Sequence, residues 1–204
     1  MNKSLLVTRP NHDRTTDYLF FWSQLVINEA KKRNFQVLDL KSKKANKKDF
    51  ESYLKKNKPS MVFFNGHGSE GSIMGHDNQP LIVSGKDFKL LSGTIIYCRS
   101  CKTGKKLGRE CVAGGTLAFI GYKRNFGFYR LEGVRGGPIR DKLAKFFLEP
   151  SNSIVVSLIK GNTVEESFRK SQKMMTRNLK DMVSTEASHE EKRLAFLLWS
   201  NKTC

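Results

Sequence analysis

The sequence has few cysteines, few acidic residues and no long apolar run. No stretch of about 18 consecutive apolar residues occurs in its 204 residues, so the sequence predicts no membrane-spanning helix. Residues 1–9 contain one short apolar run, Leu5-Leu6-Val7, which is too short for a secretory signal. We therefore expect a chain that spans no membrane and resides in the cytoplasm.

The four cysteines are Cys98, Cys101, Cys111 and Cys204. Cytoplasmic thiols stay reduced, so we expect no disulfide bonds among them. Two roles then have to be compared for these residues, a catalytic thiol and a metal ligand.

Acidic side chains are outnumbered by basic ones, 19 to 37, and the formal net charge is +18. Many of the lysines lie between Lys31 and Lys58, and aromatic residues do not alternate with them as they would in a single-strand stacking surface. A field of this sign attracts nucleic acid, anionic membranes or acidic proteins. The sequence leaves open whether this charge binds nucleic acid or forms a solvated lysine-rich surface.

The first part of the chain alternates predicted strands and helices. Short apolar runs predict strands over 5–8, 35–39, 61–64, 94–98 and 116–122. Helical spacing of apolar residues predicts helices over 13–33, 49–56 and 102–112. This alternation is typical of right-handed βαβ crossovers. We therefore predict a single domain over residues 1–204, of the α/β class, with a mostly parallel sheet of about six strands flanked by helices.

The later part of the chain has a different pattern. Residues 123–137 show no periodicity and predict a long loop over the ligand crevice. Apolar residues spaced from Ile139 onward predict a helix that Pro150 ends. A capping box at 163–166 predicts the start of another helix. The run 194–199 predicts a last strand, whose exposed edge could pair with a second copy, so the oligomeric state stays open.

Two of the predicted strands lead into residues with catalytic chemistry. The strand 61–64 is followed by His67 between two glycines, and the strand 94–98 is followed by Cys101. Ligands bind at the carboxyl ends of strands in an open parallel sheet, so we expect these two residues to face each other across one crevice. A thiol beside an imidazole is a nucleophile with its base. Each residue alone is also compatible with a turn histidine or a buried small side chain.

Oxyanion stabilisation requires backbone N–H groups near the nucleophile. Gly68 and Cys101 itself are the candidates for these donors. We also expect the helix that follows Cys101 to favour the thiolate through its N-terminus.

Other interpretations of the same stretch are weaker. Cys98 is an alternative nucleophile, but it lies within an apolar strand and no glycine follows closely. Residues 66–71 match G-x-G-x-x-G after a strand, although a dinucleotide fingerprint must open a helix. Zinc could be held by Cys98 and Cys101 with Cys111 and either His67 or His76, yet a structural zinc site usually has two paired ligand sets.

The strand ending in His67-Gly68 and the strand ending in Ser100-Cys101-Lys102-Thr103-Gly104 together resemble the caspase-like (clan CD) cysteine peptidases. They are most similar to the CHAT and gingipain-type branches, and the resemblance covers residues 4–122. It implies the caspase-like (flavodoxin-like) three-layer fold and cleavage of a protein partner by a cysteine endopeptidase. It also implies the Gly68 and Cys101 oxyanion donors, no cofactor or metal, and a place in a prokaryotic defence or cell-death system.

In the resembling families, the residue two before the nucleophile and the loop after the first strand line the substrate pocket. Those positions hold Arg99 and, in the loop, Arg9 and Arg14. A guanidinium pairs well with a carboxylate, so we predict a preference for Asp or Glu at the cut. Acidic residues in the loops near His67 would support the opposite preference; these are Glu70, Asp77 and Asp87.

A second function class stays open beside the peptidase. The chain could be a catalytically inactive caspase-like module that acts as a basic binding or scaffold protein. His12 and His76 are expected at the surface rather than as a third member of the catalytic group.

Overall fold

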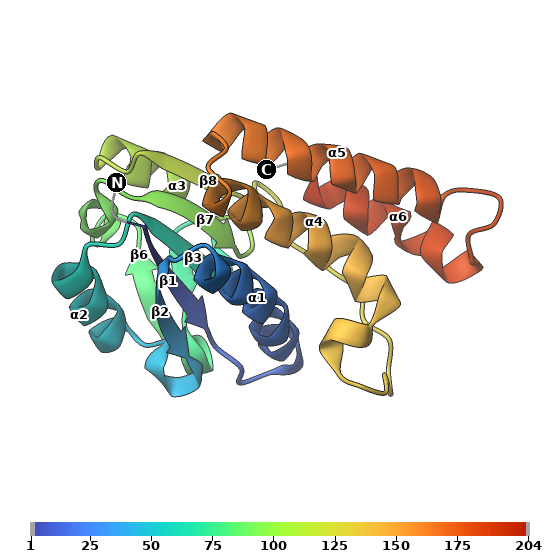
Figure 1. The fold of residues 1–204 in the computed structure, drawn as a ribbon, viewed down its shortest axis with the longest axis horizontal. Coiled ribbons are helices and arrows are strands. Elements are labelled where there is room, and N and C mark those ends of the chain that lie inside the picture. The colour runs from blue at the N-terminus through green and yellow to red at the C-terminus, as the bar shows by residue number, and fades with distance from the viewer. Residues whose placement is uncertain (1–2, 203–204) are drawn as a thin grey trace.

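A five-stranded parallel sheet forms the centre of the computed structural model, which describes residues 3–202 (Figure 1). In spatial order the strands are β2 (Gln36–Lys41), β1 (Ser4–Arg9), β3 (Met61–Asn65), β7 (Ile95–Arg99) and β8 (Ala118–Gly121). Every neighbouring pair is parallel. Counted along the chain, this is the doubly wound order 2-1-3-4-5, so the predicted α/β class is confirmed.

Helices cover both faces of this sheet. On one face lie α1 (Arg14–Lys32) and α4 (Lys142–Ile159). On the other face lie α2 (Lys47–Asn57), α3 (Leu107–Ala113) and a small antiparallel sheet of β4 (Gly68–Ser69), β5 (Ser72–Met74) and β6 (Pro80–Val83). Short 3₁₀ helices complete the connections: η1 (Ser42–Lys44), η2 (His76–Asn78), η3 (Phe88–Leu91) and η4 (Pro138–Arg140).

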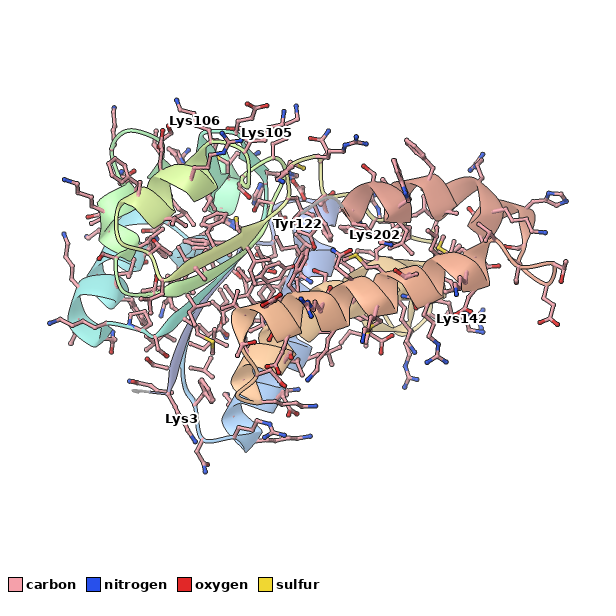
Figure 2. All side chains as sticks on the ribbon, turned by 90° about the horizontal axis from the view of Figure 1, so that it is seen from above. Lys3, Lys105, Lys106, Tyr122, Lys142 and Lys202 are labelled. Atoms are coloured by element: carbon pink, nitrogen blue, oxygen red, sulfur yellow. The ribbon has the colours of Figure 1, made fainter. Side chains whose placement is uncertain are left out.

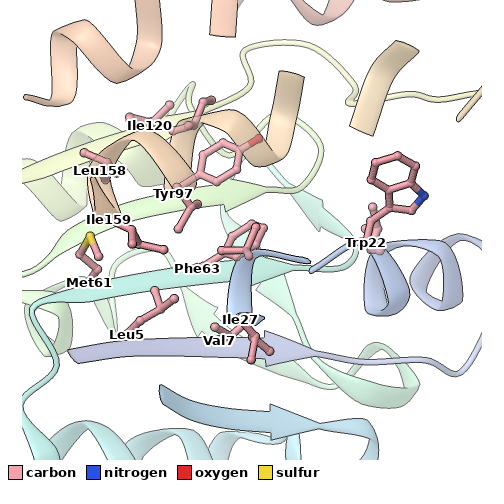
Figure 3. Packing of buried hydrophobic residues seen from close by; sticks show 14 of the residues in the cluster. Leu5, Val7, Trp22, Ile27, Met61, Phe63, Tyr97, Ile120, Leu158 and Ile159 are labelled. Atoms are coloured by element: carbon pink, nitrogen blue, oxygen red, sulfur yellow. The ribbon is translucent and has the colours of Figure 1, made fainter. Parts of the chain in front are cut away.

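The apolar runs that predicted the central strands are continuous because both sheet faces are buried. Leu5 and Val7 pack toward α1 and α4, whereas Leu6 packs toward α2. On the first face the Phe63 and Tyr97 rings stack with centroids 5.3 Å apart (Figure 3). Alternate residues of one strand therefore serve two separate cores.

Beyond α4, a helical layer extends away from the sheet (Figure 1). It consists of α5 (Val164–Met182) and α6 (His189–Asn201), which pack on α4 around Phe147, Met175 and Leu198. The capping box of Thr163 and Glu166 is present at the start of α5, as the sequence predicted. No helix within residues 3–202 is long and apolar enough to cross a membrane.

Three sequence-based expectations about elements are wrong. Residues 194–199 belong to α6 and not to a last strand, so the main sheet has five strands and its edges are β2 and β8. Pro150 does not end a helix but lies inside α4. The helix predicted over 102–112 begins only at Leu107.

Candidate active site

The carboxyl ends of β1, β3 and β7 lie side by side, and three loops leave the sheet there. Asn65 and Arg99 are paired in register at the ends of β3 and β7. His67 and Cys101 each follow two residues later, so the two loops start from the same level of neighbouring strands. The strand order reverses between β1 and β3, and such a switch point is where doubly wound sheets bind ligands.

Gly68 joins the histidine loop to the cysteine loop by close packing. A Cβ atom at this position would lie 2.8 Å from the Ser100 Cβ and 3.0 Å from the Thr103 Cγ2. Those two residues flank the turn that carries Cys101. The absence of a side chain at Gly68 therefore lets the two loops approach each other.

Gly66 lets the chain turn sharply at the end of β3. Its φ angle is +134°, in a region that side-chain-bearing residues rarely adopt. A Cβ atom there would also lie 3.0 Å from the Met74 carbonyl oxygen. The glycines on both sides of His67 are thus explained by close packing, since a side chain at Gly66 or Gly68 would collide with neighbouring atoms.

His67 is held by Asp13, a partner that the sequence analysis did not single out. The His67 Nε2 lies 2.6 Å from the Asp13 Oδ2. When this nitrogen donates its proton to the carboxylate, the Nδ1 of a neutral imidazole keeps its lone pair and can accept a proton. About 38% of each side chain is exposed, so the pair lies at the surface rather than in the core.

Asp13 is itself fixed by the helix that it caps. Its Oδ1 accepts a hydrogen bond of 2.7 Å from the Thr16 amide at the start of α1. Burial acts to raise the pKa of Asp13, but the hydrogen bonds from Thr16 and His67 outweigh it and lower the pKa to about 2. The carboxylate is therefore charged at neutral pH. The sequence offered one signal for this residue, because Asp13 is a typical helix N-cap residue and follows the first strand.

Cys101 is partly exposed and adjoins the loop after β8. Its Sγ donates to the Phe126 carbonyl oxygen at 3.7 Å. Burial raises the pKa of the Cys101 thiol, and the Lys102 ammonium opposes this only in part. α3 begins six residues after Cys101, so the expectation that a helix N-terminus stabilises the thiolate is wrong.

The other described cysteines lie in the core. Cys98 and Cys111 are fully buried, and burial raises the pKa of each thiol to about 12. This geometry speaks against Cys98 as the nucleophile, because a nucleophilic thiol needs access and a lowered pKa. No cysteine takes part in a potential metal cluster within residues 3–202. Cys204 lies outside the described residues.

The G-x-G-x-x-G match at 66–71 does not open a helix. It contains β4 and leads directly into β5, and these two strands form a short antiparallel hairpin. The phosphate-binding geometry of a dinucleotide fingerprint requires a helix N-terminus at this point. The dinucleotide interpretation is therefore wrong.

The structure separates the three arginines expected to line a substrate pocket. Arg99 is fully buried, and it donates to the side chains of Asn65 and Asn152 at 2.9 Å each. Arg9 is also buried and forms an ion pair with Asp39. For both, the expectation of an open pocket is corrected, because their donors are already used inside the protein.

Arg14 is the member of this group that reaches solvent, with 78% of its side chain exposed. It lines a cleft of about 370 Å³ together with Arg130, Asp17 and Glu132. The loop 123–137 thus lines a cleft next to the start of α1, but neither His67 nor Cys101 is among the lining residues of this cleft. Its lining charges are mixed in sign.

Acidic residues near His67 are mostly paired elsewhere. Asp87 is bound by the Lys47 ammonium at 2.9 Å, and Glu70 by the Lys105 ammonium at 2.8 Å. Both carboxylates are therefore already paired with lysines, and neither is free to bind a basic side chain of a substrate.

The sheet order and the flanking helices define a doubly wound, flavodoxin-like α/β fold, which is consistent with a caspase-like fold. Among solved structures, the chain is similar to the complex of Porphyromonas gingivalis RgpB pro- and mature domains, with a TM-score of 0.57 and 12% sequence identity. The match covers 97% of this chain and 45% of that chain, so the chain spans less than half of the similar protein's length. At this identity the likeness concerns the fold alone. No protein-family model and no curated protein matches the sequence.

Proposed function

We propose that the chain is a cysteine endopeptidase in which Cys101 is the nucleophile and His67 the base. The observation that carries this proposal is the Asp13–His67 hydrogen bond at the crevice where Gly68 packs on the Cys101 turn. RgpB is a gingipain, a clan CD cysteine peptidase, and its similar fold supports the same assignment. Protein substrates follow from the same likeness, whereas a defence or cell-death role rests on the sequence resemblance alone.

In the proposed reaction the Cys101 thiol transfers its proton to the His67 Nδ1. The resulting thiolate attacks the carbonyl carbon of a peptide bond, and the backbone N–H groups of Gly68 and Cys101 stabilise the oxyanion. The imidazolium then gives its proton to the leaving amine, which leaves an acyl group on the sulfur. Water, deprotonated by the same imidazole, hydrolyses this thioester and restores the thiol.

Asp13 acts as a positioning residue in this scheme. Its carboxylate keeps the Nε2 proton in place, so the other ring nitrogen is the one available to the thiol. The negative charge also stabilises the imidazolium that forms during the reaction.

The second candidate, an inactive binding module, is favoured by one specific observation. The Cys101 thiol donates to the Phe126 carbonyl, and burial raises its pKa, which describes a resting thiol rather than a thiolate. Catalytic hydrogen bonds often tighten only when substrate binds, so this observation and the peptidase proposal are compatible.

Thiol labelling separates the two candidates. The protein is treated with a limiting amount of an iodoacetamide probe, and labelled peptides are identified by mass spectrometry. Fast labelling at Cys101 that is lost in His67→Ala but kept in His189→Ala supports the dyad. His189 is an exposed histidine on α6 and serves as the matched control. Slow labelling that is equal in all three proteins would favour the inactive module.

Substrate preference is proposed to depend on Arg14. Its exposed guanidinium lies in one cleft with Arg130 and is 3.8 Å from the Glu132 carboxylate. An acidic substrate side chain could replace this exposed partner, because a guanidinium pairs well with a carboxylate. A peptide-library profile of the wild type should show Asp or Glu at the cut, and Arg14→Glu should reduce that preference. A profile dominated by basic residues contradicts this part of the proposal and leaves the dyad untouched.

A further inference from the structure

Three of the four histidines gather beside the candidate active site. The His12 ring lies with its centroid 6.1 Å from that of His67 and 5.2 Å from that of His76. His12 belongs to the loop after β1, and His76 belongs to η2, which follows the small hairpin. The sequence analysis expected His12 and His76 at the surface, and this expectation is wrong, since only 9% and 13% of their side chains are exposed.

Two of these imidazoles are buried without hydrogen-bond partners. Both ring nitrogens of His12 and the Nδ1 of His76 lack a partner among the described residues. The nearest carboxylate oxygen to the His12 Nε2, on Asp13, is 3.7 Å away, beyond hydrogen-bonding distance. Buried polar atoms are normally satisfied, because an unmet donor or acceptor costs free energy. This arrangement therefore indicates that something outside the chain binds there.

Asp77 adds a carboxylate to the same cluster. One ligand atom each from His12, His76 and Asp77 can be chosen so that all three lie within 4.8 Å of one another. The Asp77 Oδ1 is 3.6 Å from the His76 Nε2, and most of the Asp77 side chain is exposed. Tetrahedral zinc with bonds of about 2.0–2.2 Å separates its ligand atoms by about 3.3–3.6 Å. Small side-chain rotations would bring the three groups to that spacing.

We propose that His12, His76 and Asp77 bind a divalent transition metal, with Zn²⁺ as the ion that suits the ligands best. Two imidazoles and one carboxylate are a common zinc ligand set, and the fourth position is then open to water. The exposed side of Asp77 provides the path by which the ion enters. The bound ion would satisfy one nitrogen of each buried ring.

The alternative ligand set of His12, Asp13 and His67 is less favourable. Its atoms also lie within 4.8 Å of one another. However, the His67 Nε2 and the Asp13 carboxylate are already joined at 2.6 Å, and Asp13 also accepts from the Thr16 amide. A metal there would have to break an existing hydrogen bond, whereas no hydrogen bond to the His12 ring or to the His76 Nδ1 has to be broken at the first set.

The metal would connect two loops that carry the candidate active site. Residues 10–13 contain His12 and Asp13, and the η2 turn follows the hairpin that begins directly after His67. The η2 turn is already pinned by the His76 amide, which donates to the Ala45 carbonyl at 2.8 Å. A metal bridge between His12 and η2 would therefore hold Asp13 beside its histidine without using either of them as a ligand.

Zinc binding can be measured on the full chain independently of any peptidase activity. Chelator-treated protein is titrated with Zn²⁺ by calorimetry, and the melting temperature is recorded with and without the ion. We expect one bound ion per chain and a higher melting temperature with Zn²⁺, because a ligand of the native state stabilises it. His76→Ala and Asp77→Asn should each weaken binding by at least about tenfold, since even partners of metal ligands have effects of that size.

Three control variants should leave Zn²⁺ binding unchanged, namely His189→Ala, Cys101→Ala and His67→Ala. His189→Ala should bind Zn²⁺ as the wild type does, and so should Cys101→Ala, which keeps this test valid if the peptidase proposal fails. The exposed position of Asp77 keeps the fold intact in Asp77→Asn even if His76→Ala does not fold. The proposed site is overturned if the wild type binds no Zn²⁺ or if Asp77→Asn binds it as tightly as the wild type. It is also overturned if His67→Ala or Cys101→Ala loses the binding.

Discussion

Asp13 makes two contacts that can be separated by substitution. Its side chain caps α1 through the Thr16 amide and also holds the His67 ring. Asparagine caps a helix about as well as aspartate, but it carries no charge to orient or stabilise an imidazolium. Asp13→Asn therefore tests the role at His67, and Asp13→Ala tests both roles together.

We predict that Asp13→Asn folds normally and loses most of its peptidase activity. By analogy with other carboxylate-oriented histidines, kcat should fall by up to about 10⁴-fold. The melting temperature near neutral pH should fall only by the amount that the charged carboxylate contributes. Asp13→Ala should add a loss of stability of about 1 kcal/mol from the missing cap. The measurements are kcat on a cleaved substrate and thermal unfolding of both variants. Unchanged kcat in Asp13→Asn would show that this carboxylate does not position the base.

The lowered pKa of Asp13 predicts a pH dependence of stability. Because the folded-state pKa of about 2 lies below the ordinary value of 3.8, the charged carboxylate stabilises the native state above about pH 4. That contribution is lost as the pH falls from about 4 toward 2. Melting temperatures of wild type and Asp13→Asn should thus differ near neutral pH and converge in acid. A constant difference across this range would contradict the prediction.

Gly68 offers a steric test of the packing between the two loops. An added Cβ would lie 2.8 Å from the Ser100 Cβ, so Gly68→Ala should push the Cys101 turn away from the histidine loop. We expect a loss of about 1–3 kcal/mol in stability, as for other overpacked sites, and a loss of fast Cys101 labelling. Gly71→Ala, in the same hairpin, meets Ser84 at 3.3 Å and should have much smaller effects. Fast labelling retained in Gly68→Ala would argue against this packing.

For single residues, the sequence was sufficient to predict a location where that location follows from the end of a strand. The locations of His67 and Cys101 at neighbouring strand ends agree with the prediction, and their catalytic roles remain proposals. Asp13 was missed because its contact with His67 spans 54 positions in the sequence. The burial of Arg99 was also missed, since an arginine in the last position of a strand reads as exposed until its asparagine partners on other elements are known.

At the scale of elements, α6 shows where a short apolar run misleads. Residues 194–199 form one continuous apolar stretch, which fits a buried strand and a helix equally. The capping box of Ser188 and Glu191 was the signal for a helix. In the helix only Ala195 and Leu198 of this stretch are buried, and Phe196 is 71% exposed, so the pattern is amphipathic and not strand-like.

Pro150 shows how a helix breaker can be tolerated by tertiary contacts. Proline has no N–H, so the carbonyl of Phe146, four residues earlier in α4, loses its helical donor. The side-chain amide of Asn178 on α5 donates to that carbonyl at 2.8 Å through its Nδ2. The Ser171 hydroxyl, also on α5, donates to the carbonyl of Pro150 itself at 2.8 Å. The α4–α5 contact therefore replaces the missing bond, which no local pattern could reveal.

We predict that Asn178→Ala destabilises the protein by about 1–3 kcal/mol, because it leaves the Phe146 carbonyl unsatisfied. The loss should be largely removed in the double variant Pro150→Ala, Asn178→Ala, whose residue 150 can again donate to that carbonyl. Denaturant unfolding of the two single variants and the double variant gives the coupling free energy. Additive effects of the two substitutions would show that the Asn178 bond does not compensate for the proline.

At the scale of the whole molecule, the positive charge is spread over the surface. Figure 2 shows Lys3, the neighbouring pair Lys105 and Lys106, and Lys142 in three separate parts of the fold. The lysine-rich segment after β2 is partly used in structure, since Lys47 binds Asp87 and Lys55 pairs with Glu51. A sequence-specific nucleic-acid site would instead concentrate its basic side chains along one groove or helix.

We predict that any binding to DNA is weak, independent of base sequence and steeply reduced by salt. Two double variants test the distribution of charge: Lys43→Gln with Lys44→Gln on η1, and Lys142→Gln with Lys145→Gln on α4. All four side chains are exposed. Each double variant should lower the affinity by the same small factor, because neither pair belongs to a dedicated site. If one pair alone removed most of the binding and reduced the slope of log affinity against log salt by about 2, the charge would form a specific phosphate-binding surface there.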